Sequence, residues 1–408
     1  MKLERMTFPN AAGEELSAQI DFPIDGRPKA FALFAHCFTC TKNIKAVANI
    51  SKALSCKGVA VMRFDFTGLG DSEGDFSATS FSSNVADLVA AAEFLSTHYQ
   101  APKILVGHSF GGTASLQAAL DIPSVAAVVT IGSPADPQHV RHVLGDAMET
   151  IQAKGEAEIL LDGRPFKIRK QFLDDLQDTR IDKSIRDLKL ALLVLHSPVD
   201  DIVDIDNAAR IFKTAKHPKS FVSLDRADHL MSDPADSRYV GSVIAAWAAK
   251  YIGQEPQKEE AAEGKHGEVV TRIDESRYTT EILAGEHDLI ADEPASMGGA
   301  DQGPSPYEYL LSGLGACTAI TLRMYADRKE WPLESVLVRL KHEKIDAQDF
   351  DTCKTEKGKI DRIDRELEFI GPLDDKQIAR LTQIADRCPV HRTLHSEILV
   401  ASQVKSSQ

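Results

Sequence analysis

The clearest chemical signal in the sequence is a serine set between glycines, in the motif GHSFG at 107–111. An apolar run typical of a strand (KILV) precedes it, and a helical stretch (GGTASLQAAL) follows it. A G-x-S-x-G motif between strand and helix forms a sharp turn that exposes the serine at the helix N-terminus. Backbone N–H groups and the helix dipole there favour a developing oxyanion. Ser109 is therefore predicted to be a nucleophile.

A serine nucleophile needs a general base and an acid that orients the base, and in this context both should follow it in the chain. Asp200 follows the apolar run LALLVLHS, with Asp201 beside it as the alternative acid. His229 lies in DRADHLMSD, just past the strand-like run SFVSL. We expect Ser109, His229 and Asp200 to form a hydrogen-bonded triad.

The six cysteines are too few in so long a chain for a disulfide framework. Cys37 and Cys40 form a C-x-x-C, which could be a redox dithiol; two buried thiols are the favoured interpretation. Zinc would need two further ligands, and the sequence has no second C-x-x-C. Cys317 lies in the middle of a predicted helix, and Cys388 lies at the end of another. Taken alone, these two residues are simply buried apolar side chains. No cofactor and no metal are predicted.

Nearly continuous apolar strands alternate with helical stretches over residues 1–252, which predicts a mostly parallel sheet covered on both faces. Two earlier runs, LERMTFP and ELSAQIDFP, are expected to form an antiparallel edge pair. Residues 136–187 break the alternation as a lid-like insertion with a hairpin turning at Asp162-Gly163. The predicted strands are KAFALFAH, VAVMRFDF, PKILVGHS, VAAVVTIG, LALLVLHS and SFVSL.

The segment 253–268 (GQEPQKEEAAEGKHGE) has no apolar period and is predicted to be a linker. Residues 269–408 then follow an α+β pattern, with a long apolar helix from Pro306, two strands, a second helix and a last strand, SEILVASQV. The first helix is apolar nearly all round, which is typical of a buried helix.

Composition excludes several classes of protein. The 408 residues are 43 % hydrophobic and 26 % charged, which is ordinary for globular domains. A net charge of −14, from 47 basic and 61 acidic residues, argues against a nucleic-acid or anionic-membrane binder. The apolar runs are shorter than the ~20 residues of a membrane helix, and the start has no signal-like apolar segment. A cytoplasmic location is therefore expected.

The first 252 residues resemble the α/β-hydrolase superfamily. The order Ser109, Asp200, His229 matches the family triad, FALFAHCFT resembles its first oxyanion loop, and RFDFTGLGDSEG resembles its Arg-x-Asp-x-x-Gly-x-Gly-x-Ser-x-Gly segment. The resemblance implies hydrolysis of a small carboxylic ester or thioester, with the backbone N–H groups of Phe38 and Phe110 as the oxyanion hole. Cys37 stands where the family usually has glycine, and cysteine tolerates fewer backbone conformations.

Residues 268–405 resemble the OsmC/Ohr family of thiol-dependent hydroperoxide reductases, on the segments DEPASMGGADQGPSPYEYLLSGLGACTAITLRMYADRKEWPL and IADRCPVHRTL. The resemblance implies an intertwined homodimer. It also implies Cys317 as the peroxidatic thiolate, Cys388 as the resolving thiol, an organic hydroperoxide as substrate and an external dithiol as reductant. Best-known members orient an activating Arg with a Glu. Here Glu308 lies nine residues before Cys317, on the opposite helical face.

The sequence thus predicts an α/β fold with an N-terminal α/β-hydrolase sheet, followed by a C-terminal α+β OsmC-like domain. The resemblance is to bifunctional proteins that join the two. Arg272 and Arg277 are both candidates for the Arg that would activate the thiolate, and the sequence does not decide between them. One alternative is an esterase whose OsmC-like domain is a dimerisation or ligand-binding module without turnover. Another makes peroxide reduction the main role and the hydrolase an accessory.

Overall fold

The computed structural model describes residues 2–145, 147–161, 164–252, 268–273, 277–285, 287–346 and 358–404. The chain divides into two compact units, residues 1–272 with 281–288, and residues 273–280 with 289–408. The predicted linker at 253–268 lies outside the described residues, apart from Glu268. Across the described ranges, no helix has the length and apolar character needed to cross a membrane.

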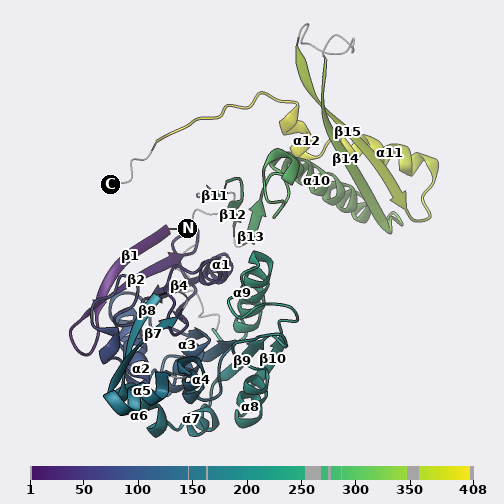
Figure 1. Cartoon of the computed structure of the whole chain (residues 1–408). Coiled ribbons are helices and arrows are strands. Elements are labelled where there is room, and N and C mark those ends of the chain that lie inside the picture. The colour runs from purple at the N-terminus through teal and green to yellow at the C-terminus, as the bar shows by residue number, and fades with distance from the viewer. Residues whose placement is uncertain are drawn as a thin grey trace. The chain divides into compact units, whose positions relative to one another are not determined.

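An eight-stranded sheet forms the centre of the first unit (Figure 1). Its strands are β1 (Lys2–Pro9), β2 (Glu15–Phe22), β3 (Ala30–Ala35), β4 (Val59–Phe64), β5 (Ile104–His108), β6 (Ala127–Ile131), β9 (Ala191–His196) and β10 (Lys219–Ser223). Their order is β1-β2-β4-β3-β5-β6-β9-β10. β2 pairs antiparallel with β1 and β4, and the remaining neighbours are parallel. The prediction of a mostly parallel sheet with an antiparallel edge pair is confirmed.

Helices cover both faces of this sheet (Figure 1). They are α1 (Lys45–Ser55) and α9 (Pro234–Ala248) on one face, and α2 (Phe81–His98), α3 (Phe110–Ala118) and α8 (Asp206–Thr214) on the other. Successive side chains of β5 alternate between the two cores, because strand residues point to opposite faces. Leu105 packs with α2 and α3, whereas Ile104 and Val106 pack with α1 and α9. This double burial explains the continuous apolar runs.

The insertion between β6 and β9 packs into the hydrophobic core of the unit. Its elements are η2 (Pro137–His139), α4 (Val140–Leu144), α5 (Ala147–Lys154), β7 (Glu156–Leu161), β8 (Arg164–Arg169), α6 (Lys170–Asp178) and α7 (Ile181–Asp187). β7 and β8 pair antiparallel as the predicted hairpin, while the predicted turn residues lie outside the described residues. Phe172, Leu173 and Leu176 of α6 join the core beneath α2 and α3.

From residue 268 onward the described residues form two small sheets, three α-helices and the short 3-10 helix η3 (Ala295–Met297) (Figure 1). The strands are β11 (Val269–Ile273), β12 (Thr280–Ala284), β13 (His287–Ala291), β14 (Ser335–Asp346) and β15 (Lys359–Ile370); the helices are α10 (Pro306–Arg328), α11 (Asp375–Ala385) and α12 (Pro389–Leu394). β11, β12 and β13 form one sheet in that order, and β14 and β15 form an antiparallel pair. Leu322 and Ala326 of α10 pack against Leu381 and Ile384 of α11.

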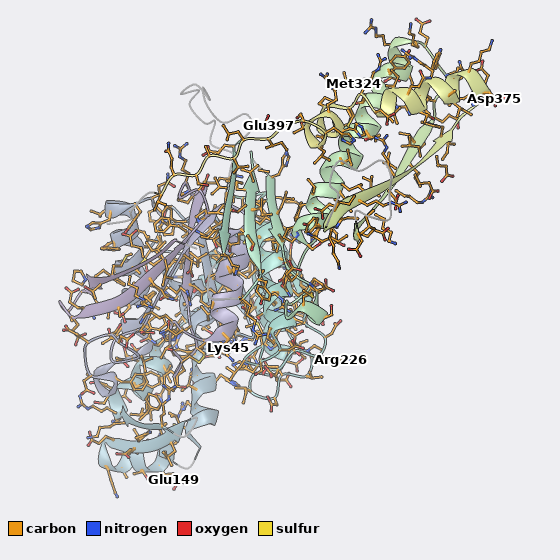
Figure 2. All side chains as sticks on the ribbon, turned by 90° about the horizontal axis from the view of Figure 1, so that it is seen from above. Lys45, Glu149, Arg226, Met324, Asp375 and Glu397 are labelled. Carbon is orange, nitrogen blue, oxygen red and sulfur yellow. A yellow bond between two sulfur atoms is a disulfide. The ribbon has the colours of Figure 1, made fainter. Side chains whose placement is uncertain are left out.

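Two expectations for this part of the chain were wrong for a single copy. α10 is buried only along one stripe (Leu314, Thr318, Leu322 and Ala326) rather than all round. Ile320 is 59 % exposed and Met324 is 67 % exposed. Figure 2 labels Met324 on this helix. The predicted last strand at 396–404 is not a strand, and Leu399 is 92 % exposed. A strand forms only where a neighbouring strand supplies hydrogen bonds, and this segment has no such neighbour among the described residues.

Candidate active sites

Ser109 occupies a strained turn between β5 and α3. Its backbone has φ 55° and ψ −126°, which is costly for a non-glycine residue and typical of functional turns. The flanking glycines allow close backbone approach. A Cβ on Gly107 would lie 2.4 Å from the carbonyl oxygen of Gly111, and a Cβ on Gly111 would lie 2.3 Å from that of His36. Glycine is therefore needed at positions 107 and 111 for this geometry.

The structure brings Ser109, His229 and Asp200 into one hydrogen-bonded chain. Ser109 Oγ lies 2.9 Å from His229 Nε2, and His229 Nδ1 lies 2.8 Å from Asp200 Oδ2. Because the carboxylate only accepts, Nδ1 carries the proton and the lone pair of Nε2 faces the serine hydroxyl. Asp201, the alternative acid, is exposed, and the carboxylate at His229 belongs to Asp200. This arrangement can remove the serine proton as the hydroxyl attacks a carbonyl.

Hydrogen bonds keep Asp200 ionised although its side chain is only 2 % exposed. Burial opposes ionisation, but hydrogen bonds from His229 and from the backbone N–H groups of Val203 and Ile202 hold the pKa of Asp200 below its usual value. The second carboxylate oxygen accepts both backbone bonds, at 2.8 and 3.0 Å. The carboxylate is thus fixed in place and can stabilise a protonated His229.

A second buried histidine supports the backbone of the first. His108 Nε2 donates to the carbonyl oxygen of His229 across 2.7 Å. Burial lowers the pKa of His108 to about 3, with the neighbouring His229 as a further cause. His108 therefore stays neutral at physiological pH and acts as a fixed donor, which its place next to the nucleophile in GHSFG did not suggest.

The two predicted oxyanion donors come from neighbouring segments. Phe110 is the first residue of α3, and Phe38 lies in the loop between β3 and α1. Their rings pack edge to face with centroids 5.2 Å apart. Neither Cys37 nor Phe38 is among the described non-glycine residues with positive φ. Cysteine in the usual glycine position therefore imposes no left-handed backbone here.

Cys37 and Cys40 form a disulfide, with Cα atoms 5.3 Å apart. The favoured expectation of two buried thiols was therefore wrong. The segments that hold the two cysteines make a tight turn, in which the Cys40 N–H donates to the Cys37 carbonyl oxygen across 3.2 Å. The Cα–Cα distance of 5.3 Å lies within the range that is usual for disulfides.

Aromatic side chains from the insertion cover the oxyanion loop. The ring of Phe172 in α6 lies 5.3 Å from that of Phe38, and Phe166 in β8 lies 5.1 Å from Phe76. Arg164 donates a hydrogen bond to the Thr39 carbonyl oxygen. Ser109 and His229 are each only 9 % exposed. The insertion therefore packs directly against the loop that carries Phe38.

The second predicted site is a pair of adjacent thiols. Cys388 caps the N-terminus of α12, where its sulfur accepts the His391 N–H at 3.3 Å and the Thr318 hydroxyl at 3.6 Å. Burial raises the pKa of Cys388, but these bonds and one from Cys317 outweigh it, so that the pKa lies below its usual value. The structure thus brings Cys317 and Cys388 together. The bonds that stabilise a thiolate fall on Cys388.

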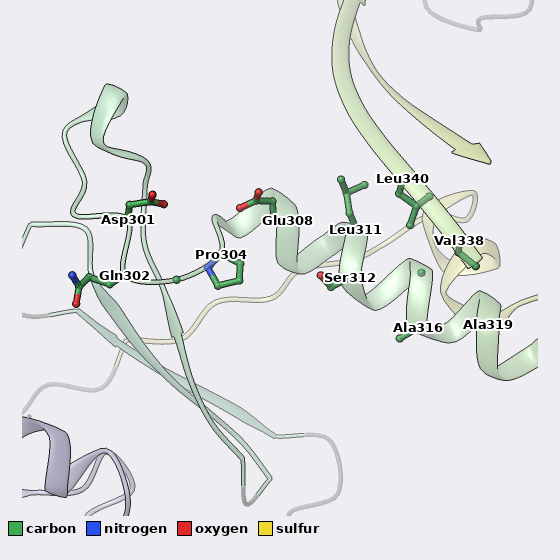
Figure 3. A pocket seen from close by; sticks show the side chains of 12 residues that line it. Asp301, Gln302, Pro304, Glu308, Leu311, Ser312, Ala316, Ala319, Val338 and Leu340 are labelled. Carbon is green, nitrogen blue, oxygen red and sulfur yellow. The ribbon is translucent and has the colours of Figure 1, made fainter. Parts of the chain in front are cut away.

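The other residues predicted for this site make local contacts of their own. Glu308 forms a capping box with Ser305 at the start of α10 and lines a groove of about 920 Å³ between α10 and β14 (Figure 3). Of the two candidate cations, Arg272 pairs with Glu281 and Arg277 donates to the Gly298 carbonyl oxygen. The groove is lined by Asp301, Gln302, Gly303, Pro304, Glu308, Leu311, Ser312, Gly315, Ala316, Ala319, Val338 and Leu340.

Comparison with known proteins identifies both parts of the chain. Residues 26–158 match the family described as serine aminopeptidase, S33, and residues 298–403 match the OsmC-like protein family. The crystal structure of the esterase domain of a Rhodothermus marinus protein is 52 % identical, with a TM-score of 0.53. The match covers 62 % of this chain and 100 % of that domain. The chain is an α/β-hydrolase fused to an OsmC-like domain.

Other relatives of the hydrolase domain are more distant. The mouse palmitoyl-protein thioesterase ABHD10, mitochondrial, is 26 % identical over 242 residues, which span 57 % of this chain and 77 % of that protein. Est1E from Butyrivibrio proteoclasticus, solved with ferulic acid, is 20 % identical with a TM-score of 0.53, and covers 60 % of this chain and 99 % of that one. At this identity it shows the fold alone. The hydrolase domain is of the esterase and thioesterase type.

A buried ion pair that the sequence did not reveal anchors the oxyanion loop of the hydrolase domain. Asp65, at the end of β4, accepts the backbone N–H of Lys42 at 2.6 Å and its ammonium group at 2.5 Å. Arg63 donates to the Lys42 carbonyl oxygen at 2.7 Å. Residue 42 is thus held through backbone and side chain. The motif RFDFTGLGDSEG contains both partners, Arg63 on β4 and Asp65 just after it. Only the pairing of β4 with β3 shows what they bind.

We expect the variant Asp65→Asn to lower kcat for ester hydrolysis roughly 10-fold with little change in KM, because a loosened loop misplaces one oxyanion donor. The double variant Asp65→Asn/Lys42→Met should recover stability, since it leaves no unpaired buried charge, but not kcat. Asp87→Asn is the matched control. Asp87 is equally buried but accepts from Thr67 instead of the loop. Equal losses of kcat in Asp65→Asn and Asp87→Asn would contradict a positioning role.

Proposed function

We propose that the hydrolase domain cleaves small carboxylic esters or thioesters with Ser109 as nucleophile. The observation that carries the proposal is the hydrogen-bonded chain from Ser109 through His229 to Asp200, at 2.9 and 2.8 Å. Geometry of this kind activates a serine that would otherwise be a weak nucleophile. The names of the esterase domain and of the palmitoyl-protein thioesterase support an acyl substrate with an oxygen or sulfur leaving group.

Each residue has a defined step in this mechanism. Ser109 Oγ attacks the acyl carbon while His229 Nε2 takes its proton, and the N–H groups of Phe38 and Phe110 bind the oxyanion. His229 returns the proton to the leaving alcohol or thiol, which leaves an acyl-serine. Water, activated by the same imidazole, then releases the carboxylic acid. Asp200 holds the tautomer and stabilises the imidazolium throughout.

A substrate series tests the assignment. Purified protein should hydrolyse p-nitrophenyl acetate and butyrate and the matching S-acyl thioesters, because the attack is on the same acyl carbon. Chain length should affect KM through the aromatic cover that Phe172 and Phe166 provide. Rates equal to those of buffer for every oxygen ester and thioester would contradict the proposal.

We propose thiol-dependent reduction of organic hydroperoxides as the activity of the OsmC-like domain. The adjacent thiols of Cys317 and Cys388 support it. A thiolate attacks the O–O bond and becomes a sulfenic acid, and the departing alkoxide takes a proton to give the alcohol. The second thiol condenses with the sulfenic acid, which forms a disulfide and water. An external dithiol then reduces the disulfide and is itself oxidised.

We propose a homodimer through the OsmC-like domain, which surfaces left uncovered in one copy support. Ile320 and Met324 are exposed on α10, and Leu399 and Val400 are exposed near the C-terminus. Figure 2 labels Met324 and Glu397 in these two segments. β14 and β15 form a two-stranded sheet, which is marginal in isolation. In the proposed dimer, a second copy would cover α10 with apolar side chains and would supply strand edges.

Charge placed on α10 should therefore dissociate the dimer. We expect Ile320→Lys/Met324→Lys to move the mass measured by light scattering from two copies toward one, because two ammonium groups cannot be buried unpaired. Leu160→Lys is the control, since Leu160 is 74 % exposed in the hydrolase domain. A wild-type mass of one copy, or a dimer unaffected by the double change, would contradict this interface.

A further inference from the structure

The Cys37–Cys40 disulfide lies in the loop that carries one of the proposed oxyanion donors. We propose that it is a thiol–disulfide exchange site through which dithiols control the rate of the hydrolase. This inference rests on the proposed function of Ser109. The family resemblance and the ester chemistry account for the loop itself, but not for two cysteines in it.

The disulfide encloses Phe38, whose backbone N–H is the proposed donor. It bridges the residue before Phe38 to the second residue after it, and the Cys40 N–H donates to the Cys37 carbonyl oxygen within the same turn. Phe38 also packs its ring on Phe110 at the nucleophile turn, with centroids 5.2 Å apart. A change in the backbone conformation between Cys37 and Cys40 would therefore shift the Phe38 N–H, which is the proposed oxyanion donor.

The two ends of the loop have anchors that do not depend on the disulfide. On one side His36 Nδ1 donates to the Cys37 carbonyl oxygen at 2.8 Å, and on the other Asp65 binds Lys42. Between these anchors Arg164 donates a hydrogen bond to the Thr39 carbonyl oxygen. Reduction should therefore leave the fold intact and give Phe38 more conformational freedom. The expected consequence is a fall in kcat rather than unfolding.

Accessibility decides which sulfur is attacked. Cys37 is only 6 % exposed, whereas Cys40 is half-buried. A thiolate of the dithiol attacks Cys40 Sγ, the S–S bond breaks, and Cys37 leaves as a thiolate that takes a proton. The second thiol of the reductant then displaces Cys40, so that the protein gains two thiols and the reductant becomes a disulfide. Glutathione disulfide reverses the reaction and releases two glutathione molecules.

Cys56, a further thiol of the same unit, does not compete in this exchange. Burial raises the pKa of Cys56 to about 12, so that it carries almost no thiolate near neutral pH. It therefore serves as an internal reference for labelling and as the site of a control variant, Cys56→Ser.

The test combines labelling with kinetics on the full-length protein. Aliquots are equilibrated with dithiothreitol or with glutathione disulfide, denatured and alkylated, and Cys37 and Cys40 are quantified by peptide mass spectrometry. In parallel, kcat and KM are measured on p-nitrophenyl butyrate. We expect both cysteines to be alkylated only after dithiothreitol, with kcat lower by roughly 3- to 30-fold and KM within 2-fold, and recovery after glutathione disulfide. Cys37→Ser/Cys40→Ser should show the reduced rate and no response, whereas Cys56→Ser should respond as wild type.

The outcomes separate this inference from the proposed function. Alkylation of both cysteines in either buffer, or a kcat unaffected while the disulfide opens and closes, overturns redox control and leaves the hydrolase assignment standing. Absence of ester hydrolysis in both redox forms instead overturns the proposed function and the control that rests on it, whatever the thiol count.

Discussion

Replacement of Ser109 by alanine should lower kcat/KM for p-nitrophenyl butyrate by roughly 10⁴-fold or more, because the acyl-enzyme route is lost. The hydrogen-bonded chain to His229 and Asp200 has no other hydroxyl at its end. A residual rate above buffer would come from the oxyanion donors alone. The measurement is initial-rate kinetics at enzyme concentrations high enough to detect that residual rate.

Ser115→Ala is the matched control for this change. Ser115 lies on the same helix, α3, is fully buried, and donates to the Gly111 carbonyl oxygen at 2.8 Å. The substitution Ser115→Ala should therefore change the stability of the protein slightly and change kcat/KM by less than about 3-fold. If Ser109→Ala kept more than a tenth of the wild-type rate, the nucleophile would have to be another residue.

Replacement of Cys317 by serine should abolish the dithiol-dependent consumption of cumene hydroperoxide and leave ester hydrolysis unchanged. A serine cannot form the sulfenic acid or the disulfide that the proposed cycle requires. Cys388→Ser should have the same effect in steady state, since Cys388 carries the bonds that favour a thiolate. Single-turnover mass spectrometry distinguishes the roles of the two cysteines. The variant that keeps the attacking thiol and lacks the resolving thiol should accumulate a sulfenic acid, whereas the other variant should not.

Cys56→Ser is the control, because burial raises the pKa of Cys56 to about 12 and makes that thiol inert. It should keep full peroxidase activity. Hydroperoxide loss at the buffer rate for the wild type would contradict the peroxidase proposal. The exposed face of α10 and the dimer would then favour the alternative, an OsmC-like assembly module attached to an esterase.

The sequence was most informative where local pattern decides structure. Strands buried on both faces are continuous apolar runs. The strands β3, β4, β5, β6 and β9 could therefore be predicted from the positions of these runs in the sequence. Ser109, Asp200 and His229 each follow a strand of one mostly parallel sheet, whose carboxyl ends meet at one edge. Their approach to hydrogen-bonding distance was therefore foreseeable.

Features that depend on distant pairing were not foreseeable. The Asp65–Lys42 ion pair exists because β4 lies next to β3 in the sheet, and β4 follows β3 only after a whole helix. The Cys37–Cys40 disulfide is local, since its cysteines are three residues apart, and the C-x-x-C motif had left a redox dithiol open as the less favoured interpretation. The segment 396–404 has the alternation of a strand but meets no neighbouring strand in the described part of one copy. Local periodicity cannot show whether a partner exists.

Labelling with a fluorophosphonate tests the central assignment most directly, because the reagent phosphonylates a serine only where a neighbouring base activates it. After incubation at neutral pH and peptide mapping, we expect one adduct, on Ser109. It should be absent from Ser109→Ala and much slower to form in His229→Ala, which lacks the base 2.9 Å away. An adduct on a different residue, or no adduct on a protein that still hydrolyses esters, would contradict the account.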